Sequence, residues 1–62
     1  MKPQEIMDFR IQHKMTEKEF AEFLGVTWQA VRLWETGQRS LSETNARLLR
    51  LFKRHPNLMK EF

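Results

Sequence analysis

The side chains best suited to recognition chemistry lie in the segment WQAVRL, residues 28–33. On a helix, one side of this segment carries four residues, Trp28, Gln29, Arg32 and Leu33. A Gln amide can pair with an adenine edge and an Arg guanidinium with a guanine edge, each pair adding roughly 1–3 kcal/mol of discrimination. The indole and the Leu side chain can contact thymine methyl groups. A purely solvated face rarely exposes Trp and Leu beside Gln and Arg, so we interpret this face as one that enters a DNA groove.

Each of these residues also has a simpler interpretation, which the sequence leaves open. Gln29 and Arg32 are both common on solvated helix faces. Trp28 could instead fold back over the preceding helix or contact a second subunit, and Leu33 could cover the rim of the core.

The helix that must support this face is predicted to begin at Thr16 and to end at Gly25. Thr16 and Glu19 have the spacing of a capping box, in which each side chain accepts a hydrogen bond from the other residue's backbone N–H. Met15 and Phe20 flank the cap as a hydrophobic staple. Gly25 supplies the left-handed conformation that ends many helices.

The helix that carries the recognition face is predicted to be capped by Thr27 and to end before Gly37. Two further helices complete the prediction, from Pro3 to about His13 and from the N-cap Ser42 to the break at His55-Pro56. One or two final turns are expected within residues 56–62. The expected buried residues repeat at helical spacing: Ile6, Phe9, Phe20, Ala21, Leu24, Ala30, Val31, Trp34, Ala46, Leu48, Leu49 and Phe52.

We therefore expect an all-α fold, a compact bundle of four or five helices that forms one domain over residues 1–62. The chain has no cysteine, which excludes disulfides, thiolate metal sites and Cys nucleophiles. His13 and His55 have no metal-ligand spacing, and no nucleophile–base pair or phosphate-binding glycine loop is present. We expect no enzymatic activity, no metal and no cofactor. The N-terminal segment lacks the apolar run of a signal peptide and no membrane span is present, which predicts a cytoplasmic protein.

Charge is unevenly distributed along the chain, whose formal net charge is +3. Residues 1–31 carry four basic and five acidic groups, whereas residues 32–54 carry six basic and two acidic groups. Such a run is found on solvated helix faces, but it also attracts polyanions such as nucleic acids. Arg50, Lys53 and Arg54 are expected only to raise this background potential.

Several short motifs resemble the Cro/C1-type (XRE-like) helix-turn-helix family of phage and bacterial regulators, which has a lambda repressor-like fold. The resemblance covers roughly Ile6 to Phe52, with the motif itself at about residues 16–37. The tail LLRLFKRHPNLMKEF is similar to antitoxin-type members of the family. The matching residues are Phe9-Arg10, Met15-Thr16, Glu19-Phe20-Ala21, Leu24-Gly25-Val26-Thr27, Val31 and Trp34-Glu35-x-Gly37.

The resemblance implies a role for individual positions. The third helix would read bases in the major groove through Trp28, Gln29, Arg32 and Leu33. Arg10 and Glu35 match positions that form a structural ion pair in the family, although two independent surface charges would give the same sequence. Contacts with the sugar-phosphate backbone are implied for Thr27, Thr36, Gln38, Arg39 and Ser40, and less strongly for Thr44 and Arg47.

The chain departs from the family at two places. Glu17 stands where the family usually has a Gln that contacts a phosphate, and a carboxylate there would be repelled by phosphate. Trp28 and Leu33 replace polar reading residues, so the expected readout combines hydrogen bonds with apolar contacts.

The C-terminal apolar residues Leu58, Met59 and Phe62 have two interpretations, a cover for the open end of the bundle or a two-fold dimer contact. We favour a homodimer, formed either in solution or only on DNA, because one small module buries little DNA surface. The leading functional prediction is a sequence-specific repressor of phage or mobile-element type that binds double-stranded DNA at a palindromic operator. The alternative is an antitoxin or other protein-interaction module, with a protein partner and with DNA binding secondary.

Overall fold

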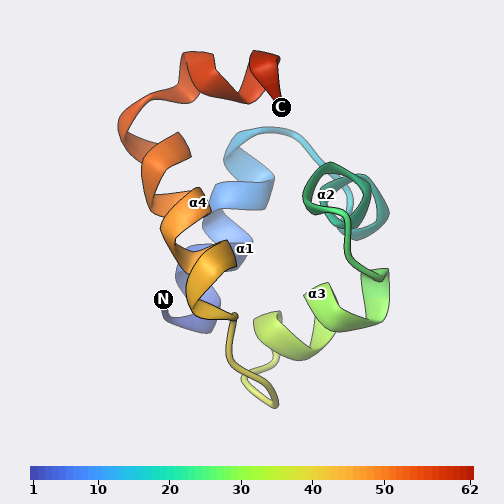
Figure 1. Cartoon of the computed structure of the whole chain (residues 1–62). Helices are drawn as coiled ribbons and strands as arrows, with labels where there is room; N and C mark the ends of the chain where they lie inside the picture. The colour runs from blue at the N-terminus through green and yellow to red at the C-terminus, as the bar shows by residue number, and fades with distance from the viewer.

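Five helical segments make up the chain, which a computed structural model describes over all 62 residues. There are no strands, so the all-α prediction is confirmed (Figure 1). No helix in the structure combines the length and the apolar character that crossing a bilayer requires. The segments are α1 (Pro3–Gln12), α2 (Glu17–Leu24), α3 (Trp28–Glu35), α4 (Glu43–Arg54) and the 3-10 helix η1 (Pro56–Glu61).

The predicted helix caps of α2 are formed. Glu19 N donates to Thr16 Oγ1 at 3.1 Å and Thr16 N donates to Glu19 Oε1 at 2.8 Å, which completes the capping box. Gly25 ends the helix at φ 75°, a left-handed conformation that costs most other residues free energy. The following helices begin in the same way, because Thr27 accepts from Ala30 N and Ser42 accepts from Asn45 N, each at 3.2 Å.

The core lies where α1, α2, α3 and α4 meet. Leu24, Ala30 and Leu48 were expected within it but are only half-buried, since a chain this short covers just one side of each helix. They pack against its edge instead. The buried residues are Ile6, Phe9, Phe20, Ala21, Val31, Trp34, Ala46, Leu49 and Phe52.

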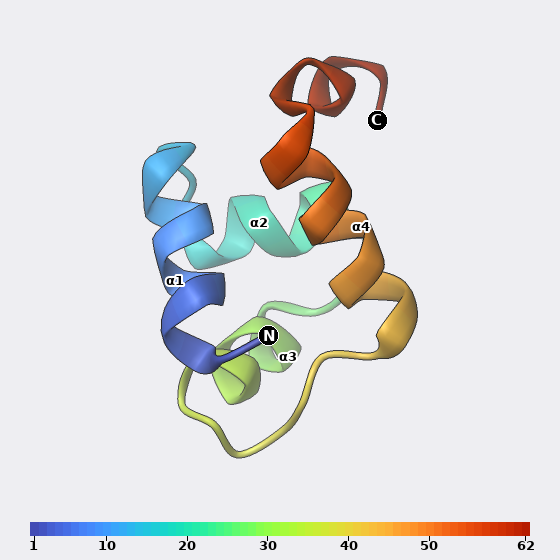
Figure 2. The same cartoon turned by 90° about the vertical axis from the view of Figure 1, so that its left-hand side faces the viewer.

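The helices are arranged so that α3 and η1 lie at opposite ends of the molecule. In Figure 2, α1 and α4 stand on either side with α2 between them, while α3 lies below and η1 above. The loop 36–42 runs past α3 at the same lower end in both views (Figures 1 and 2). One end of the bundle is therefore formed by α3 and this loop.

An ion pair joins α1 to the end of α3. Arg10 Nε donates to Glu35 Oε2 at 2.7 Å and Arg10 Nη2 donates to Glu35 Oε1 at 3.0 Å, a two-pronged geometry. Arg10 Nη1 also donates to the backbone oxygen of Met15 at 3.1 Å. The side chains of Arg10 and Glu35 are only 16% and 4% exposed. This hydrogen bonding raises the pKa of Arg10 above its usual value, although partial burial opposes the shift.

The C-terminal segment closes the upper end of the bundle through aromatic contacts. The ring of Phe62 lies 5.0 Å from that of Phe23 and 5.4 Å from that of Phe52, centroid to centroid. Met59 is half-buried against the core, whereas Leu58 remains exposed. Met59 and Phe62 thus make contacts that the covering interpretation requires, while the dimer contact stays a prediction.

We predict that Arg10→Met lowers the free energy of unfolding by about 2–4 kcal/mol, because it leaves the buried Glu35 carboxylate without its partner. The double variant Arg10→Met/Glu35→Met should recover much of this loss, since replacing both partners removes the unpaired charge. Because the pKa of Arg10 is raised, its positive charge is lost only at very high pH, so this contribution to stability should persist as the pH rises through the alkaline range. Urea unfolding followed by circular dichroism measures it.

The matched control is Arg47→Met, which removes an exposed ion pair with Glu43 and should cost under about 0.5 kcal/mol. Equal losses for the two single variants would contradict a bracing role for Arg10.

We predict that Phe62→Ala lowers the free energy of unfolding by about 1 kcal/mol, because two aromatic contacts are lost from a side chain that is already 60% exposed. Leu58→Ala, in the same helix but exposed, serves as the control and should change stability by less. Thermal unfolding compares the two variants, and a larger loss for Leu58→Ala would show that the wrong residue has been assigned to the cover.

Candidate functional site

The candidate site is built on α3, a helix with two chemically different sides. Val31 and Trp34 are 0% and 5% exposed and anchor the helix in the core. On the other side Trp28 is 38% exposed, Gln29 and Arg32 are exposed, and Leu33 is half-buried. The four residues predicted to form one face therefore lie on the same side of α3, and Leu33 is the least exposed of them.

The turn between α2 and α3 determines where this face begins. Val26 N donates to Ala21 O at 2.9 Å, which folds the turn back onto α2. Thr27 then caps α3 by accepting from Ala30 N. Since a hydroxyl both donates and accepts, the Thr27 O–H is still available to donate to an acceptor outside the protein.

Arg32 is held between two neighbours on the site's surface. Its guanidinium carbon lies 5.6 Å from the centre of the Trp28 ring, within the range of a cation–π contact. One of its nitrogens lies 3.6 Å from Glu17 Oε1, a loose ion pair with side chains 62% and 27% exposed. The guanidinium is thus oriented before any partner binds, by contacts weak enough to be exchanged.

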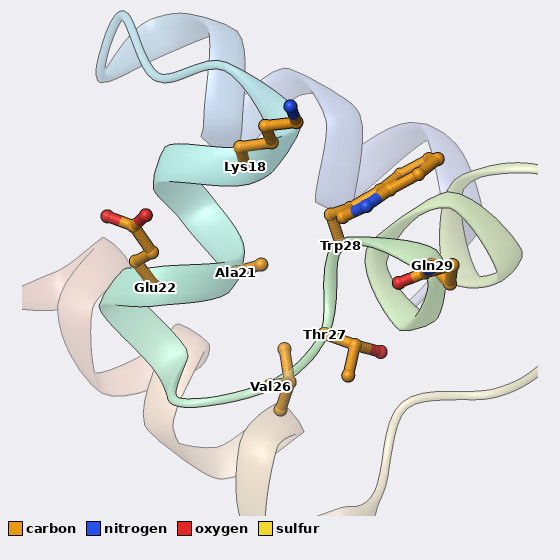
Figure 3. Close-up of a pocket in the computed structure, with 7 residues that line it drawn as sticks. All are labelled: Lys18, Ala21, Glu22, Val26, Thr27, Trp28 and Gln29. Atoms are coloured by element: carbon orange, nitrogen blue, oxygen red, sulfur yellow. The ribbon is translucent and has the colours of Figure 1, made fainter.

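A hollow of about 310 Å³ opens beside Trp28, between α2 and the first turn of α3. Figure 3 shows that one wall is formed by side chains of α2 and the other by the turn and the start of α3. Trp28 therefore lines the hollow across from side chains of α2 while it remains 38% exposed, and its role stays a prediction. The residues around the hollow are Lys18, Ala21, Glu22, Val26, Thr27, Trp28 and Gln29.

The loop after α3 lies against the end of that helix. Gln38 N and Arg39 N both donate to Leu33 O, at 3.0 and 3.2 Å, and Thr36 Oγ1 donates to the same oxygen at 3.2 Å. These bonds place the exposed side chains of Gln38, Arg39 and Ser40 beside α3. Because the Thr36 proton is used internally, its hydroxyl is left mainly as an acceptor.

Thr44 and Arg47 are exposed in the first half of α4. The Nε of Arg47 lies 3.4 Å from Glu43 Oε1, so part of its charge is neutralised by a neighbour one turn away. No three His, Asp or Glu side chains come together in an arrangement that could hold a metal ion.

Three features of the site were missed at the level of sequence. The Glu17–Arg32 pair, the Lys18 wall of the hollow and the Arg10 bond to Met15 O all join residues of different elements or loops. No local pattern reports such contacts. Only the family resemblance predicted a contact of this kind, the Arg10–Glu35 pair, and that pair is formed.

Comparison with known proteins supplies the family. Residues 1–62 match the family described as the antitoxin component of bacterial toxin-antitoxin systems, MqsA. The chain belongs to the MqsA antitoxin family. No curated protein gives a significant match.

An antitoxin has protein or DNA partners, so membership in the MqsA family calls for a recognition surface. The face of α3 combines an exposed indole, an amide and a guanidinium with no binding partner inside the chain beyond Glu17. It is the leading candidate for such a surface.

Proposed function

We propose that this MqsA-family antitoxin is a sequence-specific DNA-binding repressor of the Cro/C1 helix-turn-helix type, with α3 in the major groove of an operator. The observation that carries the proposal is the division of α3 into a buried side, Val31 and Trp34, and an exposed side that gathers Trp28, Gln29 and Arg32. The whole chain then serves as one DNA-binding domain.

Access to the groove favours this function. A helix with its side chains is about 10–12 Å across, close to the roughly 12 Å width of the major groove. α3 packs on α1 and α2 at one end of the bundle, next to the loop 36–42, and its exposed side carries Trp28, Gln29 and Arg32 (Figures 1 and 2). The same loop would bring Gln38, Arg39 and Ser40 to the phosphates on the groove's rim, which fixes orientation without reading sequence.

The chemistry of the face suits base reading. Gln29 would pair with adenine and Arg32 with guanine, while Trp28 and Leu33 would contact thymine methyl groups or sugars. Arg32 must exchange its exposed contact with Glu17, worth at most about 1 kcal/mol, for a guanine contact worth roughly 1–3 kcal/mol. The exchange is therefore favourable at the correct base.

The size of the molecule points to two copies on one operator. Its longest dimension is 30 Å, so a single copy covers about one groove. Helix-turn-helix dimers present two reading helices about 34 Å apart, one DNA turn, and bind palindromic sites. A homodimer formed on DNA would supply the buried area that tight specific binding requires.

The family match favours a second function, neutralisation of a toxin through direct protein contact. The two functions are compatible if they use different surfaces. They are distinguished by whether variants on α3 abolish DNA binding alone or both activities.

We predict that the double variant Gln29→Ala/Arg32→Ala loses specific DNA binding. Duplexes selected from a random pool by the unaltered protein should bind the variant roughly a hundredfold more weakly, because two base contacts are removed. Mobility shift at several salt concentrations measures this, and affinity should fall steeply with salt because each neutralised phosphate adds about 0.9 to the logarithmic slope.

The control is Gln12→Ala/Arg54→Ala, which removes the same residue types from exposed positions outside α3. It should retain the selected sequence preference. Weak, uniform binding by the unaltered protein to every duplex would contradict specific reading.

We predict that Glu17→Gln strengthens binding to unselected duplexes by roughly threefold while it lowers the ratio of specific to unselected binding. The Glu17 carboxylate near the groove repels the phosphates of any duplex. At the specific site, the contact of Arg32 with the correct base offsets this repulsion. Glu61→Gln, in η1 at the far end of the molecule, removes one negative charge as a control. An equal rise in affinity for both variants would show that Glu17 affects binding only through the net charge of the protein.

A further inference from the structure

The outer face of α4 and the start of η1 form a second exposed surface that DNA reading does not use. We call it the α4–η1 face and define it by Arg50, Leu51, Arg54 and Leu58. Leu51 and Leu58 are 42% and 41% exposed, two of the few large apolar side chains left in solvent. The side chain of Arg50 is 53% exposed, and Arg54 is also exposed.

The surface is hollowed because the chain changes direction there. His55 ends α4 and Pro56 begins η1, which turns across the upper end of the bundle (Figure 1). A hollow of about 580 Å³ opens at this bend, and a second of about 250 Å³ continues along α4. Both hollows share Leu51, Arg54 and His55 in their lining, so they adjoin one another.

The charge of the face is positive and largely uncompensated. Glu43 lies 3.8 Å from Arg50 and 3.4 Å from Arg47, at the far end of α4 from the bend. Arg54 forms no ion pair within the chain. The two exposed leucines are thus bordered by Arg54, which has no partner within the chain, and by Arg50, which shares the single carboxylate of Glu43 with Arg47.

Two occupants fit this face poorly. A duplex read by α3 would lie at the opposite end of the molecule from η1 (Figures 1 and 2). Phosphates bind through charge, so they would not favour the burial of exposed leucines. A second copy in a two-fold contact would pair this positively charged face with itself, which the repulsion of like charges disfavours.

We propose that the α4–η1 face binds an acidic segment of a partner protein, with carboxylates at Arg50 and Arg54 and an apolar side chain between Leu51 and Leu58. An apolar centre with a charged rim is the usual composition of a protein–protein contact. The proposal rests on the toxin-binding arm of the proposed function and names the chemistry by which such a partner is recognised.

The test uses the full chain and a fluorescein-labelled peptide of Glu residues around two central Leu residues. Fluorescence anisotropy should detect binding, and Arg50→Glu/Arg54→Glu should weaken it by roughly tenfold or more. The control Lys53→Glu/Lys60→Glu makes the same charge change at exposed positions outside both hollows and should retain most of the binding. Leu51→Ser should also weaken binding, and circular dichroism checks that each variant is folded.

Other outcomes would overturn the proposal. If polyglutamate binds as tightly as the Leu-containing peptide, or if Leu51→Ser has no effect, the face binds acidic peptides through positive charge alone and the apolar contact is excluded. Nuclear magnetic resonance shifts at Leu51 and Leu58 on adding duplex DNA would assign it to nucleic acid, and a dimer by light scattering that Arg54→Glu dissociates would assign it to a second copy. DNA binding by the same variants is measured separately. Loss of the peptide interaction would therefore not affect the test of DNA binding by α3.

Discussion

The Arg10–Glu35 ion pair is the contact on which the rest of the arrangement depends. α3 has eight residues, too few to be stable as an isolated helix, so its position is determined by what holds its ends. Thr27 and the turn from α2 hold the first end. At the second end, one guanidinium joins Glu35 to α1 and to the backbone before α2. Arg10 thus connects α1, the end of α3 and the segment before α2. These contacts determine which side of α3 faces outward.

In the proposed function, the same short helix serves both for stability and for recognition. Val31 and Trp34 contribute to the core, which leaves only the opposite side of α3 for a partner. This double use is consistent with the half-burial of Leu33 and with the position of Trp28, which lines a hollow beside α2. Recognition side chains that are partly packed lose less conformational freedom on binding, which favours a face with apolar members.

Much of the fold was predictable because its signals are local. Capping residues such as Thr16 and Ser42, and the glycine at position 25, act within one turn of chain, so sequence spacing was enough to locate the helix ends. Contacts between elements were not predictable in this way. The approach of Glu17 to Arg32 depends on how α2 crosses α3, and the half-burial of Leu24 and Ala30 depends on how far neighbouring helices reach. Likewise, Leu51 and Leu58 become one surface only because the chain bends at His55-Pro56.

The two surfaces proposed for partners lie at opposite ends of one core. A partner at the α4–η1 face would not cover α3, so steric exclusion between a protein and an operator is not expected from this geometry (Figure 2). Any influence of one partner on the other must instead pass through the common core cluster, to which α4 contributes Leu49 and Phe52 and α3 contributes Val31. Such coupling requires that the core adopt two arrangements that the partners distinguish. A core whose largest side chains are almost fully buried resists that change, which favours simultaneous and nearly independent binding.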